Sequence, residues 1–255
     1  MARSIAIHSF KGGTGKSTIT ANLAVALVSR GRNVGVMDMD LEGPGLHVIF
    51  NVDPEQIQHT LNDVLLEKAR PEEAALLMND RLSLKESGKL YFSPASTKVD
   101  DMLTTLRTGF EVESFSKAIS KLQDQFQLDY LLIDTHPGLE NDTLLAMGVC
   151  DHLLLVSRID QQDIFGTGVM VQIANTLGKP THLVVNMIPA SLKNSQASKL
   201  ANGIGAQFKV GLLGWFPFSE EVQRSLSRSV FILTERRHSM TVKFQELARQ
   251  VERFS

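Results

Sequence analysis

The sequence predicts an α/β fold in which a mostly parallel, doubly wound sheet of about seven or eight strands carries helices on both faces, giving three layers. Short apolar runs alternate with amphipathic stretches along the chain, as they do when helices cover a parallel sheet. The 255 residues, 43% of them hydrophobic, suffice for one large core. Because we find no repeat, low-complexity tract or linker-like segment, residues 1–255 are expected to form a single domain.

The strands and helices can be assigned in order along the chain. Runs rich in Val, Ile and Leu predict strands at residues 4–9, 33–37, 89–93, 130–134, 152–156, 182–186 and 210–214. Apolar residues at helical spacing predict helices at residues 16–29, 111–126, 141–147, 161–177 and 240–254. The last helix is expected to pack on the sheet through its apolar side, which consists of Phe244, Leu247, Ala248, Val251 and Phe254.

A glycine-rich loop joins the first strand to the first helix. Residues 11–18 read Lys-Gly-Gly-Thr-Gly-Lys-Ser-Thr, and a glycine loop between a strand and a helix N-terminus is typical of a phosphate site. Glycine lets backbone N–H groups approach phosphate oxygens closely. Lys16 is suited to neutralising the β and γ phosphates, Ser17 to holding Mg²⁺, and Thr18 to the α-phosphate region. The expected nucleotide contacts are Gly12, Gly13, Thr14, Gly15, Lys16, Ser17 and Thr18.

The loop departs from the common G-x-x-x-x-G-K-[ST] pattern, because Phe10 replaces the first glycine and Lys11 opens the loop. In this respect it resembles the deviant Walker A loop of the MinD/ParA family of ATPases. The resemblance implies a P-loop NTPase fold of the deviant Walker A type, ATP and ADP with Mg²⁺ as cofactors, and ATP hydrolysis involving Lys11 and Lys16. It also implies that Lys11 reaches the nucleotide of a second subunit, so that ATP-bound chains form a homodimer.

Two aspartates follow the strand at residues 33–37. The carboxyl ends of parallel strands line the ligand crevice of an open α/β sheet, so Asp38 and Asp40 are expected to face the phosphates. Asp38 is suited to supporting Mg²⁺ or its bound water, and Asp40 to positioning or deprotonating the attacking water. The resemblance also assigns hydrolysis to the second aspartate. The alternative is that Asp40 only caps the turn before Pro44.

A third acid ends the apolar strand at residues 130–134 and is followed by Thr-His-Pro-Gly. This segment resembles a Walker B element, which implies that Asp134 holds a magnesium-bound water and that the Gly138 N–H approaches the γ-phosphate. His136 stands where the family commonly has proline. Either it senses the γ-phosphate or hydrogen bonds hold it in the loop.

Two later segments are expected to contact adenine. Asn186 ends a strand with an amide that can donate and accept, and the family commonly has Asn there; the alternative is a role in a turn. Pro217 and Phe218 follow the last strand and resemble the loop that closes over the base. Phe218 could instead belong to the core.

Charge and cysteine content narrow the function classes. The formal charge is -2, with ten acids against two bases in residues 38–80 and ten bases against five acids in residues 187–255. Cys150 is the only cysteine, so paired thiolates within one chain are excluded, and we expect it to be buried. We find no signal peptide and no apolar run of about 18 residues. The chain is therefore expected to be cytoplasmic.

The family resemblance implies a switch in which ATP-bound dimers position or partition a cellular cargo and a partner protein stimulates hydrolysis. The dimer would act at the nucleoid or at the inner membrane face. Since the last helix is expected to belong to the core, no amphipathic tail remains for a membrane. Basic residues of the C-terminal part favour non-specific DNA binding, although they could equally form a solvated face: Lys193, Lys199, Lys209, Arg224, Arg228, Arg236 and Arg237.

The competing function class is an ATP-dependent factor that inserts or delivers a metal or cofactor. A metal in such a factor would require two Cys150 residues to pair across a dimer axis.

Overall fold

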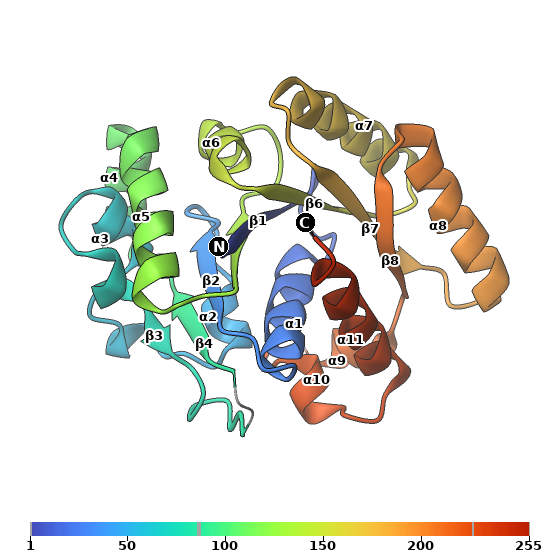
Figure 1. Ribbon diagram of the computed structural model, residues 1–255, viewed down its shortest axis with the longest axis horizontal. Helices are drawn as coiled ribbons and strands as arrows, with labels where there is room; N and C mark the ends of the chain where they lie inside the picture. Colours follow the sequence, from blue (N-terminus) through green and yellow to red (C-terminus); the bar gives the residue numbers. More distant parts are fainter. Residues whose placement is uncertain (1, 86–87, 226, 255) are drawn as a thin grey trace.

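The computed structural model describes residues 2–85, 88–225 and 227–254. Its centre is one eight-stranded sheet in the order β3-β4-β2-β5-β1-β6-β7-β8 (Figure 1). Neighbouring strands are parallel, except that β3 is antiparallel to β4 at one edge. The strands are β1 (Arg3–His8), β2 (Val34–Met39), β3 (Leu76–Leu77), β4 (Leu90–Ser93), β5 (Tyr130–Thr135), β6 (His152–Ser157), β7 (Thr181–Ile188) and β8 (Gly211–Pro217).

Helices cover both faces of this sheet (Figure 1). The helices are α1 (Lys16–Val28), α2 (Leu46–Ile49), α3 (Leu61–Leu65), α4 (Val99–Thr108), α5 (Val112–Gln125), α6 (Asn141–Val149), α7 (Gln161–Thr176), α8 (Asn194–Phe208), α9 (Glu220–Arg224), α10 (Phe231–Thr234) and α11 (Ser239–Val251), with 3-10 turns η1 (Pro54–Gln56) and η2 (Pro71–Ala74). The three-layer α/β fold expected from the sequence is confirmed.

Each face of the sheet has its own hydrophobic core. In β1, Ile5 and Ile7 point into the core beneath α1 and α11, whereas Ala6 points into the core beneath α5, α6 and α7. Side chains alternate in this way because successive residues of a strand face opposite sides. Burial on both faces explains the nearly continuous apolar runs of the central strands.

Helix α1 lies deep in the molecule. Eleven of its 13 residues are buried, and it packs between the central strands on one side and α10 and α11 on the other. A helix enclosed in this way is apolar around most of its circumference, so it shows no amphipathic stripe. The glycine loop therefore leads into the most enclosed helix of the fold.

All seven strands and five helices expected from the sequence are present, with ends that differ by a few residues. The last helix ends at Val251, and Phe254 lies beyond it, buried against the rings of His152 and His182. The sequence does not predict α8, because its buried side consists mainly of small residues that give a faint apolar period: Ala197, Ala201, Ile204 and Gly205.

Candidate functional site

The glycine loop leaves β1 and forms a cavity of about 270 Å³ at the carboxyl edge of the sheet. Gly13 and Gly15 have φ angles of 75° and 85°, a left-handed conformation that glycine adopts without strain. A Cβ atom on Gly15 would lie 2.5 Å from the Asn186 amide nitrogen. The cavity is lined by Ser9, Gly12, Gly13, Thr14, Gly15, Lys16, Ser17, Thr18, Asp40, Gly45, Ile49, Pro137 and Ser227.

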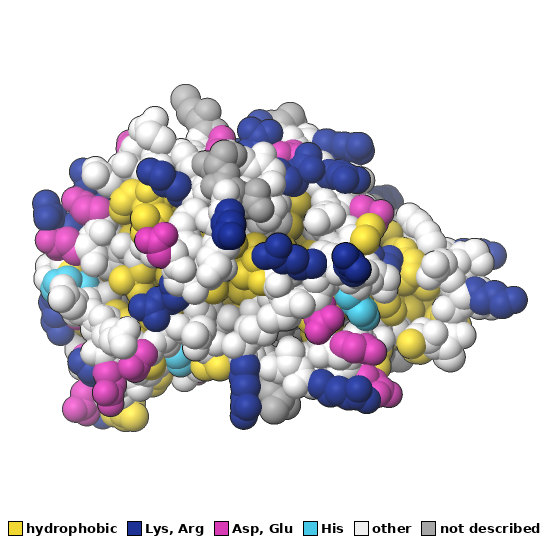
Figure 2. Space-filling view, turned by 90° about the horizontal axis from the view of Figure 1, so that it is seen from below, with side chains coloured by type: hydrophobic (Ala, Val, Ile, Leu, Met, Phe, Trp, Pro, Cys, Tyr) yellow, Lys and Arg dark blue, Asp and Glu magenta, His cyan; other side chains and the backbone are white. Residues whose placement is uncertain are grey.

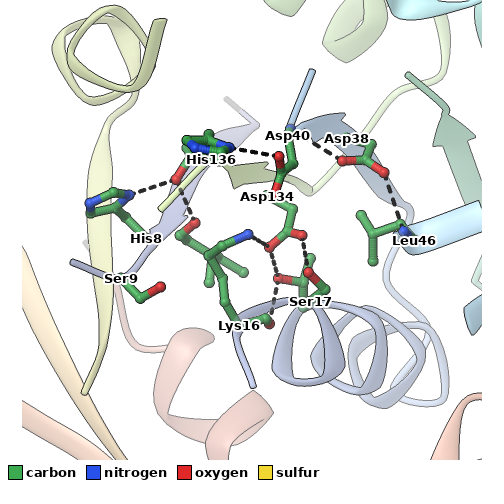
Figure 3. A network of polar contacts seen from close by, with 12 residues as sticks. His8, Ser9, Lys16, Ser17, Asp38, Asp40, Leu46, Asp134 and His136 are labelled. Carbon is green, nitrogen blue, oxygen red and sulfur yellow. Dashed lines mark hydrogen bonds and ion pairs between the residues drawn. The ribbon is translucent and has the colours of Figure 1, made fainter. Parts of the chain in front are cut away.

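Lys16, Ser17 and Asp134 meet beside this cavity, although Asp134 comes from β5 (Figure 3). The Lys16 Nζ atom lies 3.1 Å from Asp134 Oδ1, and the Ser17 hydroxyl donates to Asp134 Oδ2 at 2.6 Å. Thr20 Oγ1, one turn further along α1, lies 2.8 Å from Asp134 Oδ1. The carboxylate thus joins the first turns of α1 to β5.

Two buried polar atoms of the loop lack a hydrogen-bond partner among the residues that the structure describes. Lys16 Nζ has its ion pair with Asp134 but no aligned hydrogen bond, and Thr14 Oγ1 has no partner. Buried polar groups in native proteins are nearly always hydrogen-bonded, so these two atoms call for a partner. A ligand with several oxygen atoms in the glycine cavity, such as a polyphosphate, would supply the acceptors for the ammonium group.

Asp38 and Asp134 lie side by side, because β2 and β5 pair them in register. Asp38 Oδ2 accepts from the Leu46 N–H and Oδ1 from the Asp40 N–H, both at 3.2 Å. Burial, followed by the negative charge of Asp134, raises the pKa of Asp38 to about 8. A divalent cation bound between the two carboxyl groups and Ser17 would relieve this repulsion.

No cluster of three or more His, Cys, Asp or Glu side chains suited to a metal occurs within residues 2–85, 88–225 and 227–254. Magnesium sites that serve nucleotides typically use one or two carboxylates, with phosphate oxygens and water completing the shell. Ser17 and Asp134, with Asp38 beside them, fit a magnesium site that phosphate oxygens and water complete.

Asp40 follows β2 and lines the glycine cavity. Its Oδ1 atom accepts from the Gly43 N–H at 3.1 Å and lies 2.8 Å from His136 Nδ1. Asp40 therefore does cap the turn before Pro44, but with one oxygen only. His136 is the loop histidine held by hydrogen bonds, and the contact with Asp40 connects the segments that follow β2 and β5 (Figure 3).

His8 ends β1, and Gly138 lies in the loop that follows the neighbouring strand β5. The Gly138 N–H, expected to approach a γ-phosphate, donates to the Ser9 carbonyl oxygen at 3.1 Å, and its φ is 100°. His8 is fully buried at the end of β1, with Nδ1 2.8 Å from Thr135 Oγ1. Burial and the nearby Lys16 charge lower the pKa of His8 to about 3. His8 was not among the residues predicted from the sequence, where its only signal is its place at the end of the strand that leads to the loop.

Lys11 lies against the N-terminal turn of α7 in the same chain. Its ammonium group contacts the Gln162 side-chain oxygen and lies 3.9 Å from Asp160 Oδ1. Phe10 also packs on α7, since a Cβ atom on Gly166 would overlap its ring. The start of the glycine loop is thus fixed to α7.

The residues expected to contact adenine line a small cavity of about 60 Å³ next to the loop. Asn186 lies 8% exposed and donates through Nδ2 to the Thr14 carbonyl oxygen at 2.7 Å. Pro217 and Phe218 line the same cavity, and Phe218 is 37% exposed, so it does not belong to the core. The structure brings all three to the same end of the sheet as the glycine loop.

A family model described as "AAA domain" matches residues 2–186. The septum site-determining protein MinD of Bacillus subtilis is 26% identical over 255 residues, covering 98% of this chain and 89% of that protein. The chain belongs to the MinD/ParA family of ATPases. An uncharacterised ATP-binding protein of Methanocaldococcus jannaschii is 29% identical over 231 residues, covering 88% of this chain and 78% of that one.

Solved structures of the MinD/ParA family share this fold over the whole chain. The cell division ATPase MinD of Pyrococcus furiosus matches with a TM-score of 0.83 and 27% identity, covering 100% of both chains. MinD of Pyrococcus horikoshii, complexed with Mg-ADP, matches with a TM-score of 0.83 and 25% identity, covering 99% of this chain and 97% of that one.

A relative of another kind matches part of the sequence. The cytosolic Fe-S cluster assembly factor CFD1 of Candida albicans is 31% identical over 174 residues, covering 67% of this chain and 57% of its own length.

The seven basic residues considered for DNA binding are exposed but divided between two places in this MinD/ParA fold. Three of them lie on or next to α8, namely Lys193, Lys199 and Lys209. The other four lie on α9 or in the segments around α10, namely Arg224, Arg228, Arg236 and Arg237. Figure 2 shows Lys and Arg side chains over the face seen from below, with Asp and Glu between them. Of the helices in the described ranges, none combines the length and the apolar character needed to cross a bilayer.

Proposed function

We propose that this chain is a Mg²⁺-dependent ATPase that acts as an ATP-controlled dimerisation switch and positions or partitions a cellular cargo, with residues 1–255 forming one domain. The observation that carries the proposal is the buried Lys16 ammonium, which is paired with Asp134 beside a glycine-lined cavity. Membership of the MinD/ParA family and the relation to the Mg-ADP complex of Pyrococcus horikoshii MinD support ATP, ADP and Mg²⁺ as its cofactors.

The residues of the site divide the work of phosphate binding and hydrolysis. Lys16 and the N–H groups of the loop would hold the phosphates, while Ser17 and Asp134, with Asp38 beside them, would hold Mg²⁺. Bound Mg²⁺ would neutralise phosphate charge and orient the phosphates for hydrolysis. Asp40 would position the attacking water or take its proton. Gly138 would turn its N–H from the Ser9 carbonyl toward the γ-phosphate.

The adenine base would bind in the small cavity beside the loop. Its entry requires the Asn186 amide to exchange the Thr14 carbonyl oxygen for the edge of the base. Pro217 and Phe218 would then cover the ring from the end of β8.

Dimerisation depends on Lys11 in this proposal. Within one chain Lys11 contacts Gln162 and Asp160, both on the exposed start of α7, and these surface contacts are weak. The ammonium group could therefore leave them for the phosphates of a partner's nucleotide. Hydrolysis would remove the γ-phosphate from this contact, weaken the link across the interface and release the partner.

We expect Lys11→Ala to bind ATP as well as the parent chain but to remain monomeric with ATP. Nucleotide titration measures the first property, and light scattering with and without ATP measures the second. Lys121→Ala, which removes an exposed lysine of α5, is the matched control and should dimerise normally. An undiminished ATP-induced dimer of Lys11→Ala would refute the role of Lys11 across the interface.

The surface on which the switch acts is proposed to be DNA. Binding through exposed Lys and Arg side chains without base contacts should weaken steeply as salt rises. Gel shifts with arbitrary duplex DNA, with and without ATP and from 50 to about 200 mM salt, are expected to show ATP-dependent, salt-sensitive binding. Sedimentation with anionic vesicles is the parallel assay, and binding there without DNA binding would assign the membrane instead.

The relation to CFD1 supports a second candidate, an ATP-dependent carrier of a metal or cluster. Cys150 argues against it, because the thiol is fully buried and burial, followed by the negative charge of Asp151, raises its pKa to about 12. Such a thiol cannot meet its counterpart in a second copy without local unfolding. Stoichiometric iron in the purified protein would favour this candidate.

A further inference from the structure

The carboxylate of Asp40 is anchored through one of its two oxygens. Oδ1 accepts from the Gly43 N–H at 3.1 Å and contacts His136 Nδ1 at 2.8 Å. Within the described part of the chain, Oδ2 makes no hydrogen bond, and the side chain is 15% exposed beside the glycine cavity. One oxygen is thus fixed by the protein while the other remains available to a water molecule.

Both the backbone and the ring of His136 make hydrogen-bond contacts. The Thr143 hydroxyl, in the first turn of α6, donates to the His136 carbonyl oxygen at 3.1 Å. Because an ionised carboxylate only accepts, Nδ1 is the ring nitrogen that carries the hydrogen toward Asp40. The other nitrogen, Nε2, is 3.9 Å from Glu42 Oε2, which is beyond hydrogen-bond distance. Among the residues that the structure describes, the hydrogen-bond contact of the ring is therefore the one with Asp40.

We infer that His136 is a positioning residue that orients Asp40 for its work on the attacking water; the inference rests on the role proposed for Asp40. The Gly43 N–H alone leaves the carboxylate free to turn about its terminal bond, whereas two donors on one oxygen define its plane. Orientation of this kind matters because reacting groups must be held within a fraction of an ångström. Proline is common at position 136 in the family and has no side-chain donor. This chain therefore has an orienting contact that the usual family sequence cannot make.

Three substitutions of His136 test the inference in the full-length protein. Asn places its amide nitrogen near the position of Nδ1, Gln places it near the position of Nε2, and Ala removes the donor. We expect His136→Ala and His136→Gln to lower kcat for ATP hydrolysis by about 10- to 100-fold, with KM for ATP within about twofold, whereas His136→Asn stays within about threefold of the parent. The contrast between the two amides tests a merely structural role, because both carry the same donor group and the extra methylene of Gln moves that donor away from the position of Nδ1.

The Asp40→Asn background separates this inference from the proposed function. If Asp40→Asn is as active as the parent chain, the role proposed for Asp40 is wrong. If Asp40→Asn is impaired and His136→Ala lowers its activity no further, the two residues act as one unit and the inference is supported. Parent-like kcat of His136→Ala, equal activity of the Asn and Gln variants, or an additive loss in the Asp40→Asn background would each overturn the positioning role.

Discussion

Lys16→Ala is expected to lower the affinity for ATP by about 100-fold or more, because charge-assisted contacts to phosphate are among the strongest hydrogen bonds in proteins. The Lys16 side chain is 6% exposed, and its buried ammonium group has no aligned hydrogen bond in the described part of the chain. It can therefore donate to a ligand while it stays beside Asp134. Titration with ATP or ADP, followed by calorimetry, measures the loss.

The loss must be separated from unfolding, since removing Lys16 leaves the buried carboxylates of Asp38 and Asp134 without a cation. Breaking a buried pair in this way destabilises a protein by about 3 to 5 kcal/mol, so denaturant unfolding of Lys16→Ala should accompany the titration. Lys11→Ala is the control within the same loop and should bind ATP normally. If folded Lys16→Ala binds ATP as tightly as the parent chain, the glycine cavity is not the phosphate site.

Asp40→Asn is expected to reduce ATP turnover by about 10²- to 10⁴-fold, the range that a positioned acid or base contributes, while ATP binding is retained. The amide keeps the shape of the side chain and an oxygen for the Gly43 N–H, but it is a poor base. The variant should therefore accumulate as an ATP-bound dimer that dissociates slowly. Phosphate release under single-turnover conditions and light scattering over time measure the two effects.

Asp53→Asn is a matched control for this substitution. Asp53 is exposed and, like Asp40, accepts a backbone N–H of its own turn, from Glu55 at 3.0 Å. Turnover in Asp53→Asn should equal that of the parent chain. A dimer of Asp40→Asn that dissociates as fast as the parent dimer would transfer the water-positioning role to another residue.

The positions of the site acids could be predicted from the sequence because each follows an apolar run. Asp38 and Asp134 lie at the ends of β2 and β5, and any parallel sheet brings the ends of neighbouring strands to one edge. The glycine loop could be placed for the same reason, since β1 lies next to β5. The common edge could be predicted without the strand order, whereas the place of β5 between β2 and β1 is known from the structure.

The contacts between the side chains could not be predicted. His136 and Asp40 are 96 residues apart in the chain, and their meeting depends on the path of two loops that no periodicity describes. His8 was missed because a histidine at a strand end has no pattern of its own, and its contact with Thr135 of the neighbouring strand is known from the structure. Two-residue strands such as β3 likewise lack a period that the sequence could show.

The enclosure of α1 divides the site into a fixed half and an adjustable half. Lys16 and Ser17 begin a helix that is surrounded by the sheet and α11, so moving them would disturb the hydrophobic core. Asp40 and His136, in contrast, belong to partly exposed segments outside helices and strands. We therefore expect residues 40–45 and 136–140 to change conformation when a γ-phosphate binds or leaves. The start of α1, which would hold the remaining phosphates, should keep its position through the cycle.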